Sequence, residues 1–278
     1  MPASELAYFM DKAIPAAFAA GKAIMQVRRT ALDVSSKQDG SPVTQADREA
    51  HQTIQEHLTD TGLPVLSEEG ATIEAEERQR WELYWLVDPL DGTKEFIKGN
   101  GEYSVNIALM RRDQLPAGPA GAAMPVAGVL YVPVKDLLYF AWEGGGAYRQ
   151  HDAATQTPGP TYDRAALALR LPAMEKRGTY TIVASRSHTN ASTSAFIERK
   201  RFEHGAVRIA RMGSALKICL VAEGAADVYP RFGPTMEWDT AAGHAICNET
   251  GRTITDMATG RPMRYNKYDL MNNAFIVE

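Results

Sequence analysis

Two acidic residues in one short segment have the type and spacing that can hold a metal ion. Asp88 and Asp91 lie in Trp85-Leu-Val-Asp-Pro-Leu-Asp-Gly-Thr-Lys-Glu-Phe96, directly after the apolar run at 84–87. Carboxylate oxygens suit Mg²⁺, which proteins usually bind through one or two carboxylates together with substrate phosphates. We therefore interpret this segment as an acidic loop, just beyond a strand end, that binds a metal and a phosphate.

The residues that follow Asp91 favour the same interpretation. Gly92 lets the backbone approach a phosphate closely, and amide groups point at the anion if Thr93 begins a helical turn. The alternative is an acidic surface turn, because Asp-Gly and Asp-Pro are common turn dipeptides.

Two further segments add carboxylates. Glu68 follows an apolar run at 64–66, and Asp239 stands at the start of an expected helix. Each has a simpler explanation, since Glu68 could be solvated and Asp239 could cap its helix. If the segments converge, repulsion raises the carboxylate pKa values unless divalent cations neutralise them. Two cations about 4 Å apart could then polarise a phosphoryl oxygen and activate a water molecule.

The composition is that of a folded protein without a polymeric nucleic-acid partner. The 278 residues are 45% hydrophobic and 23% charged, which allows a large core. The formal net charge is −4, with 30 basic and 34 acidic residues interspersed, so there is no basic face for a nucleic-acid backbone. Cys219 and Cys247 lie in apolar patterns, which predicts buried free thiols in a reducing cytoplasm.

The N-terminal segment predicts an amphipathic helix that is neither a signal peptide nor a membrane span. Acidic and basic residues interrupt it, and no basic region precedes it. Pro15 must begin a helical segment or kink the helix. No segment approaches the roughly 20 apolar residues of a transmembrane helix. The apolar stripe consists of Leu6, Met10, Ile14, Phe18, Gly21 and Met25.

The elements that position the acidic residues form two halves, which we predict to be domains 1–150 and 151–278. The first is expected to be α+β and the second α/β, with the poorly periodic stretch 151–170 between them. Thr44 and Asp47 predict a capping box at the start of one helix. In the first half we expect helix 44–59, strands 84–87, 103–109, 128–132 and 137–142, and an exposed loop at 112–126. In the second half we expect strands 179–184, 206–210, 226–230 and 252–255 and helices 190–203, 213–224 and 239–249.

With these motifs, the sequence resembles the lithium-sensitive, Mg²⁺-dependent phosphatases of the inositol monophosphatase superfamily. Within it, the chain is most similar to the bacterial 3′(2′),5′-bisphosphate nucleotidases, because inositol phosphatases more often carry Thr-Asn where Lys94-Glu95 stands. The superfamily blocks are Ser67-Glu-Glu69, Asp88-Pro-Leu-Asp-Gly-Thr93 and Trp238-Asp-Thr-Ala-Ala-Gly-His244. The nucleotidase segments are Asp91-Gly-Thr-Lys-Glu-Phe-Ile-Lys98, Ser185-Arg-Ser-His188, Leu220-Val-Ala-Glu-Gly224 and Tyr229-Pro-Arg-Phe-Gly-Pro234. The family pattern often has a basic residue where Gly99 stands.

The resemblance implies a layered αβαβα sandwich with the site in the cleft between the halves. One Mg²⁺ would be bound by Glu68, Asp88 and the carbonyl group of Leu90, and another by Asp88, Asp91 and Asp239. The first half would thus carry most metal ligands, and the second would carry Asp239 and the nucleotide-binding residues. Two or more Mg²⁺ ions are implied, and Li⁺ is expected to inhibit by occupying a metal position.

The resemblance also implies roles in catalysis and substrate binding. Glu68 and Thr93 would activate the attacking water, supported by Asp47, and its capping role is compatible with this one. Lys217 makes physical sense as a partner of a second phosphate. His188 could instead be a surface histidine, Gly213 a turn glycine and Lys217 a solvated lysine. The implied substrate-binding set is Glu68, Leu90, Asp91, Gly92, Thr93, Ser185, His188, Gly213, Lys217 and Asp239.

These matches imply a nucleotidase of sulfate assimilation that hydrolyses 3′-phosphoadenosine 5′-phosphate (PAP) to AMP and phosphate. Its sulfated precursor PAPS, giving APS, would be a second substrate. The implied mechanism is direct attack of water, activated by two metals, without a phosphoenzyme. We expect a cytoplasmic monomer or homodimer that could lie at the inner face of the cell membrane.

Three alternatives stay open. The first is an inositol-1-monophosphatase or a related sugar phosphatase, because a dianionic phosphate on a metal site is the same group in each substrate. The second makes Asp88 a nucleophile, as in haloacid-dehalogenase-like phosphatases, but two residues separate Asp88 from Asp91 where that family has one. The third is a non-catalytic metal-binding regulatory module, although Glu68, Thr93 and Asp47 are all present.

Overall fold

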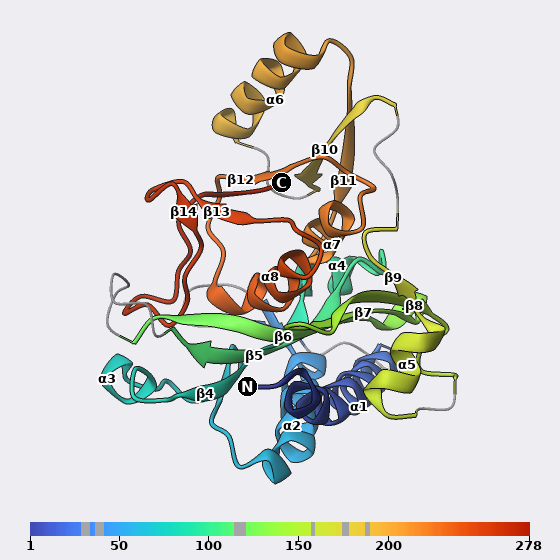
Figure 1. Cartoon of the computed structure of the whole chain (residues 1–278), viewed down its shortest axis with the longest axis vertical. Coiled ribbons are helices and arrows are strands. Elements are labelled where there is room, and N and C mark those ends of the chain that lie inside the picture. The colour runs from blue at the N-terminus through green and yellow to red at the C-terminus, as the bar shows by residue number, and fades with distance from the viewer. Residues whose placement is uncertain (29–33, 37–41, 114–120, 157–158, 174–177, 187–189) are drawn as a thin grey trace.

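The chain folds into alternating layers of helices and sheets. The computed structural model describes residues 1–28, 34–36, 42–113, 121–156, 159–173, 178–186 and 190–278. Figure 1 shows helices α1 and α2, a large sheet, helices α7 and α8, smaller sheets and finally α6 in succession. The predicted αβαβα sandwich is therefore confirmed. Within the described residues, no helix combines the length and apolarity needed to cross a membrane.

Two helices cover one face of the large sheet. Helix α1 (Ala3–Val27) continues through Pro15 and buries most of the predicted apolar stripe, in which Leu6, Met10 and Ile14 are at most 3% exposed. Phe18 and Met25 of the stripe are partly buried. Helix α2 (Gln45–Leu58) begins after Thr44, whose backbone N–H donates to the Asp47 carboxylate at 2.7 Å. The predicted capping box is thus confirmed, and it fixes Asp47 at the start of α2.

Among the described residues, the large sheet has seven strands in the order β3-β4-β5-β6-β7-β8-β9, and only β3 and β4 are parallel. Its strands are β3 (Val65–Ser67), β4 (Leu83–Asp91), β5 (Ser104–Arg112), β6 (Ala123–Val132), β7 (Leu137–Trp142), β8 (Gly146–His151) and β9 (Leu169–Arg170). The short elements of this half are β1 (Val34–Ser36), β2 (Pro42–Thr44), α3 (Ala75–Arg78), α4 (Thr93–Lys98), α5 (Thr161–Leu167) and the 3₁₀ helices η1 (Thr59–Thr61) and η2 (Pro133–Lys135).

We predicted that the acidic segment is a loop beyond a strand end. In the structure, it is instead the last part of β4. Asp88 pairs with Asn106 and Asp91 with Ser104, so Pro89 and Leu90 together face one residue of β5. This is a β-bulge, a position that tolerates proline because the ladder hydrogen bond is already interrupted. The bulge changes the direction of the strand between the two aspartates.

The stretch 151–170, which we predicted to be a connection, contains α5 and β9. Strand β9 pairs with β8, so the large sheet extends to Arg170. Helix α5 buries mainly Thr161 and Arg164, and these polar residues leave no apolar periodicity for a sequence pattern to detect. The predicted domain boundary near residue 150 stays a prediction.

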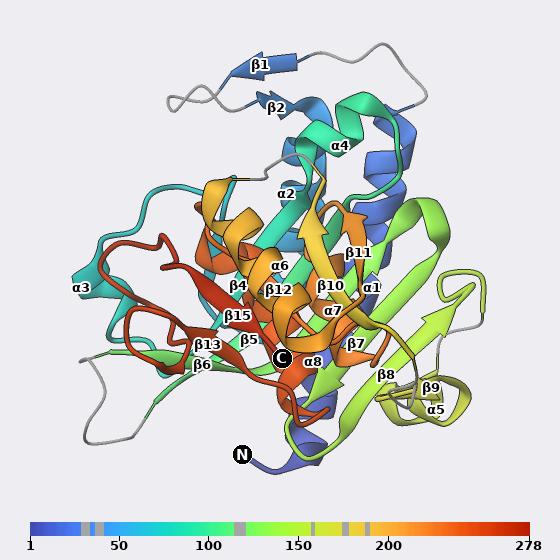
Figure 2. The ribbon, with the colours of Figure 1, turned by 90° about the horizontal axis from the view of Figure 1, so that it is seen from above.

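The second half begins with the predicted strand-helix-strand unit. Strands β10 (Tyr180–Ser185) and β11 (Val207–Met212) are parallel, and α6 (Ala191–His204) connects them and lies over them in Figure 2. The later strands are short and antiparallel, in the order β12-β15-β13-β14, which differs from the expected continuation. They are β12 (Tyr229–Arg231), β13 (Ile254–Asp256), β14 (Arg261–Pro262) and β15 (Phe275–Val277).

Two helices of the second half begin later than predicted. Helix α7 (Leu216–Ala222) follows Ser214, whose φ of 48° lies in the left-handed region and prevents an earlier start. Helix α8 (Ala241–Asn248) follows the 3₁₀ helix η3 (Glu237–Asp239), so Thr240 and not Asp239 precedes it. Asp239 therefore does not cap α8.

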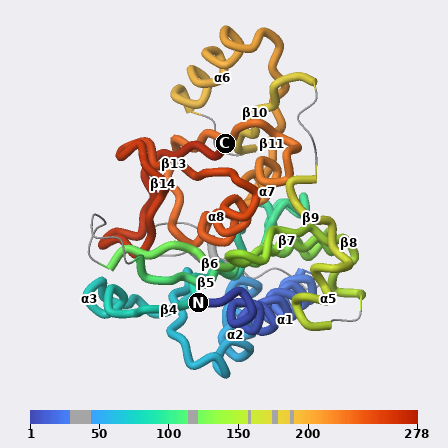
Figure 3. Tube along the Cα trace, viewed as in Figure 1, coloured from blue at the N-terminus to red at the C-terminus, as the bar shows by residue number. Residues whose placement is uncertain are grey.

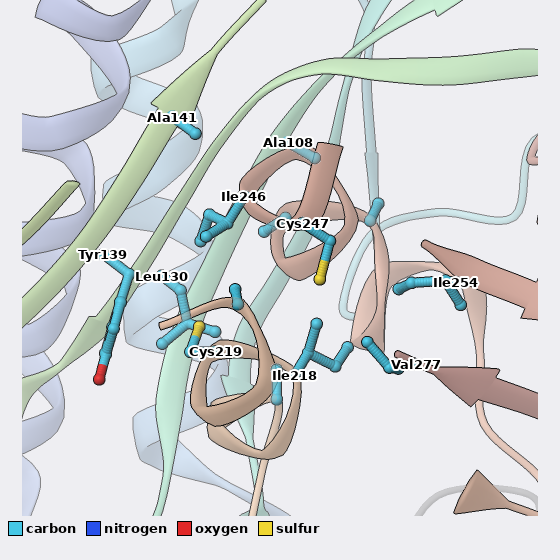
Figure 4. Packing of buried hydrophobic residues seen from close by; sticks show 14 of the residues in the cluster. Ala108, Leu130, Tyr139, Ala141, Ile218, Cys219, Ile246, Cys247, Ile254 and Val277 are labelled. Carbon is cyan, nitrogen blue, oxygen red and sulfur yellow. The ribbon is translucent and has the colours of Figure 1, made fainter. Parts of the chain in front are cut away.

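The second half packs directly on the first sheet through α7 and α8. Figure 3 shows α8 against β5 and β6, and Figure 4 shows Cys219 of α7 and Ile246 of α8 near Leu130 of β6. Cys219 and Cys247 lie in this core as buried free thiols, as predicted. A Cβ atom at Gly128 of β6 would lie 2.5 Å from the Ala242 carbonyl oxygen. Glycine at this position lets the backbones of β6 and α8 approach, and Asp239 lies two residues before the start of α8.

We predict that Gly128→Ala lowers the free energy of unfolding by about 1–3 kcal/mol, because overpacking moves α8 away from the sheet. Urea denaturation measures the change. Gly233→Ala is the control, since a Cβ atom there would lie 3.7 Å from its nearest neighbour, an ordinary contact. Equal denaturation midpoints for the two variants would contradict the prediction.

Candidate active site

Carboxylates from three elements meet at one edge of the large sheet. Glu68 follows β3, Asp88 lies in β4, and Asp239 ends η3, and each offers an oxygen atom within 4.8 Å of the others. Parallel β3 and β4 present their carboxyl ends at the same edge. The packing of α8 on β6 brings η3 to that edge. The predicted convergence of the three segments is confirmed.

Backbone amides hold these carboxylates in place. The Leu90 N–H donates to Asp88 at 3.0 Å, and the Met236 N–H donates to Asp239 at 2.9 Å. Asp91 accepts the Ala215 N–H at 2.5 Å, so it is joined to the segment before α7. Their positions are therefore set by the backbone of both halves.

Asp88 is buried and the rest of the cluster is partly buried, and neighbouring acidic side chains raise the pKa of Asp88 and Asp239. Burial raises the pKa of Asp88 well above its ordinary value, and the charges of Glu68, Asp91 and Asp239 add to this. Burial also raises the pKa of Asp239 strongly, with Asp91 and Glu68 contributing. Burial raises the pKa of Asp91, against the opposing charge of Lys217. These converging carboxylates resist full ionisation when no cation neutralises them. Such a set of oxygen donors fits a divalent cation such as Mg²⁺.

Behind the cluster, Asp47 orients Thr93. One Asp47 oxygen accepts the Thr44 backbone N–H, and the other accepts the Thr93 hydroxyl at 3.1 Å. The Thr93 hydroxyl also lies 3.4 Å from the Leu90 carbonyl oxygen. Asp47 is 2% exposed, and burial raises its pKa. The capping and orienting roles of Asp47 are compatible in the structure.

Gly92 occupies a backbone conformation that favours glycine. Its φ is 95°, and a Cβ atom would lie 3.2 Å from the Glu102 carbonyl oxygen. Helix α4 begins at Thr93 directly afterwards, so the expected helical turn is present. The chain can therefore run close to whatever lies beside Asp91.

A cavity of about 230 Å³ opens beside the cluster and collects most of the predicted residues. His188 lies outside the described residues. Asp47, Asp88 and Leu90 lie behind the lining. The predicted residues that line the cavity are Glu68, Asp91, Gly92, Thr93, Ser185, Gly213, Lys217 and Asp239. Lining residues that the sequence analysis did not name as site residues include Lys94, Glu95, Ser214, Tyr229, Arg231 and Thr235.

Lys217 and Arg231 are two of the cationic residues that line the same cavity. Lys217 is 7% exposed, donates to the Ser214 carbonyl oxygen, and lies over the Tyr229 ring at 5.4 Å from its centroid. The idea of a solvated lysine is therefore wrong. Burial lowers the pKa of Lys217 to about 8, against the charge of Asp91, and the neighbouring Arg231 adds to the lowering.

Arg231 is the most informative lining residue that we missed. One of its Nη atoms donates to the Pro234 carbonyl oxygen at 2.8 Å, while Nε is buried without a hydrogen-bond partner in the described part of the chain. A buried guanidinium N–H without a partner is rare in proteins. The signal was present in the Tyr229–Pro234 segment, but a charged residue in a short strand does not show from sequence that it faces inward.

Gly213 serves close packing, not a left-handed turn. A Cβ atom there would lie 2.7 Å from the Glu102 carbonyl oxygen, and the Gly213 N–H donates to the Glu102 carboxylate at 2.8 Å. This amide is therefore bonded within the protein. Gly213 lines the cavity through its backbone.

Comparisons with known proteins identify the family of this chain. The inositol monophosphatase family profile matches residues 5–278. The chain is 41% identical to the 3′(2′),5′-bisphosphate nucleotidase CysQ of Escherichia coli strain K12 over 273 residues, which cover 96% of this chain and 98% of that protein. It is 42% identical to the CysQ nucleotidase of Salmonella typhimurium strain LT2 over 263 residues, covering 93% and 94%.

Solved structures give the same picture. The crystal structure of CysQ from Bacteroides thetaiotaomicron, described as a bacterial member of the inositol monophosphatase family, is 47% identical, with a TM-score of 0.84 and coverage of 96% and 95% of the two chains. The suhB protein of Bartonella henselae is 27% identical with a TM-score of 0.69, covering 96% and 92%. With a family profile that matches nearly every residue and relatives that align along their whole length, this chain belongs to the inositol monophosphatase family.

Proposed function

We propose that the protein is a Mg²⁺-dependent 3′(2′),5′-bisphosphate nucleotidase that converts PAP to AMP and phosphate. One observation carries the proposal: a single cavity is lined both by Glu68, Asp91 and Asp239 and by Lys217 and Arg231. A cation-neutralised cluster suits one phosphate, and two cationic side chains suit a second one. The nucleotidases of Escherichia coli and Salmonella support the same substrate class. The cytoplasmic location and the oligomeric state stay predictions.

The metal site would be built from side chains of both halves. Glu68, Asp88, Asp91, Asp239 and the carbonyl group of Leu90 would hold two or more Mg²⁺ ions. When bound, these ions supply polarisation of the phosphoryl oxygens and a lower pKa for a water molecule. Li⁺ is proposed to inhibit by taking one of the positions.

The remaining chemistry would come from the chain itself. Thr93, held by Asp47, would orient the attacking water in line with the scissile bond, and Glu68 would accept its proton. The backbone at Gly92 would lie against the transferred phosphate. Water would attack phosphorus directly, so no bond to Asp88 would form. Ser185 and Lys217 would bind the part of the substrate beyond the scissile phosphate.

We expect the protein with Mg²⁺ to hydrolyse PAP with a kcat/KM at least about tenfold above that for inositol 1-phosphate, because the second phosphate gains charge-assisted hydrogen bonds. Phosphate release from both substrates and from PAPS measures this, and Li⁺ should inhibit it.

Arg231→Gln should reduce the preference for PAP, whereas Arg199→Gln on the exposed side of α6 should not.

Other outcomes have clear meanings. A preference for inositol 1-phosphate would overturn the nucleotidase proposal in favour of an inositol monophosphatase. Mg²⁺ binding without phosphate release from any of these substrates would indicate a non-catalytic metal-binding module.

Asp88→Asn should lower kcat by more than about a hundredfold, since even the loss of an outer partner of a metal ligand costs 10–100-fold. The variant should still fold, because Asn keeps the shape of the side chain and removes one of the repelling charges. Its melting temperature without Mg²⁺ at neutral pH should equal or exceed that of the wild type. Asp60→Asn is the control, because the Asp60 side chain is 79% exposed and distant from the cluster. Near-normal turnover by Asp88→Asn would refute the metal assignment.

Stabilisation by Mg²⁺ should increase with pH. Asp88, Asp91 and Asp239 have raised pKa values in the folded protein, so the ion-free protein loses stability as pH rises from about 4 through those values. Mg²⁺ competes with these protons, so its effect is small when they are bound and large when they have left. The difference in melting temperature between Mg²⁺ and chelator should be larger at about pH 7.5 than at about pH 5.5. A difference that is constant or decreases with pH would contradict this.

A further inference from the structure

One acidic side chain outside the metal cluster joins the two halves at the edge of the cavity. Glu102 lies between α4 and β5, and its carboxylate accepts from Arg186 Nη2 at 2.7 Å and Arg186 Nε at 2.8 Å. It also accepts the Gly213 N–H at 2.8 Å. Arg186 follows β10 and Gly213 follows β11. One carboxylate from the first half therefore binds the ends of both parallel strands of the second half.

The local sequence fixes the position of Glu102. Gly99 and Gly101 have φ values of 72° and 75°, a conformation that other residues rarely adopt. The Asn100 side chain accepts the Glu102 N–H at 3.0 Å, which closes the turn between them. The backbone of Glu102 in turn packs against Gly92 and Gly213. The carboxylate is thus presented from a rigid turn and not from a free loop.

The contacts are strong enough to keep Glu102 charged. The Glu102 side chain is 13% exposed, against 47% for Arg186. Burial opposes the charge, but the hydrogen bonds from Arg186 and Gly213 outweigh it and lower the pKa of Glu102. Charge-assisted bonds of this bidentate kind are stronger and more directional than neutral ones.

The segment that Glu102 holds carries one wall of the cavity. Ser185 directly precedes Arg186, and the chain after Gly213 leads to Ser214 and Lys217. Ser185, Ser214 and Lys217 line the cavity. This segment is bonded at Gly213 to Glu102 and at Ala215 to Asp91. Without Glu102, the segment would lose the Gly213 bond and keep the Ala215 bond to Asp91.

We propose that Glu102 is a positioning residue for substrate binding. Its carboxylate sets the ends of β10 and β11 against the acidic segment of β4, and so places Ser185 and Lys217 for the part of the substrate that the metals do not reach. The inference rests on the proposed nucleotidase function. Because the scissile phosphate is bound elsewhere, the loss of Glu102 affects the KM of a bisphosphate more than kcat.

The test compares Glu102→Ala and Glu102→Gln with a matched ion pair elsewhere. Glu143 forms a similar bidentate pair with Arg111, at 2.7 and 2.9 Å, on the large sheet away from the cavity. We expect Glu102→Ala to raise the KM for PAP about tenfold and to change kcat by less than about twofold. Glu102→Gln keeps one oxygen for the Gly213 N–H, so its effect on KM should be smaller. Glu143→Gln should change neither constant.

The result that overturns the inference is an unchanged KM in both Glu102 variants, or a parallel loss of kcat and melting temperature with KM unaffected. If Glu102→Ala fails to fold, Glu102→Gln decides in the same way. If the wild type does not hydrolyse PAP, the proposed function fails separately. Calorimetric titration with AMP and Mg²⁺ then tests the inference: weaker binding by Glu102→Ala than by Glu143→Gln supports it, and equal binding overturns it.

Discussion

Mutual repulsion between buried carboxylates is the constraint on which this structure depends. Glu68, Asp88 and Asp239 offer oxygen atoms within 4.8 Å of one another, and burial together with the neighbouring charges raises the pKa of Asp88 and Asp239. Backbone N–H groups hold Asp88 and Asp239 in place, so the side chains cannot swing apart to relieve the repulsion. A divalent cation relieves it instead. The folded protein is therefore less stable without the ion, but its site is already arranged before an ion binds.

The rest of the fold can be understood as the means of holding that arrangement. Parallel β3 and β4 bring Glu68 and Asp88 to one edge, and the bulge at Pro89 redirects β4 so that Asp91 meets the segment before α7. Asp239 arrives from the second half, because α8 packs closely on β6 and η3 precedes it. The position of each of these carboxylates therefore depends on backbone packing that extends well away from the site.

The sequence predicts what is encoded locally and misses what depends on distant partners. The Thr44–Asp47 capping box, strand β7 and the acidic motifs were predicted, because their signals lie within a few residues. The continuation of β4 past Asp88 was missed, since Pro89 usually ends a strand and the bulge exists only opposite β5. The two-residue and three-residue strands β14 and β15 are too short to show a period. The resemblance implied which acidic residues would bind metal ions. The geometry of the structure alone revealed Arg231 and Glu102.

The two halves of the chain contribute different residues to the site. The first half supplies Glu68, Asp88 and Asp91, which would treat any phosphate monoester alike. The second half supplies Asp239 to the carboxylate cluster and adds Lys217 and Arg231, whose charges suit a ligand with a second anionic group. Such a division requires that the distance between the two sets be fixed. Asp91 and Glu102 set it from the first half, since they bind Ala215 and Gly213 across 124 and 111 residues of sequence. Selectivity in this arrangement therefore arises from how rigidly two separately encoded surfaces are joined, as much as from the residues on either one.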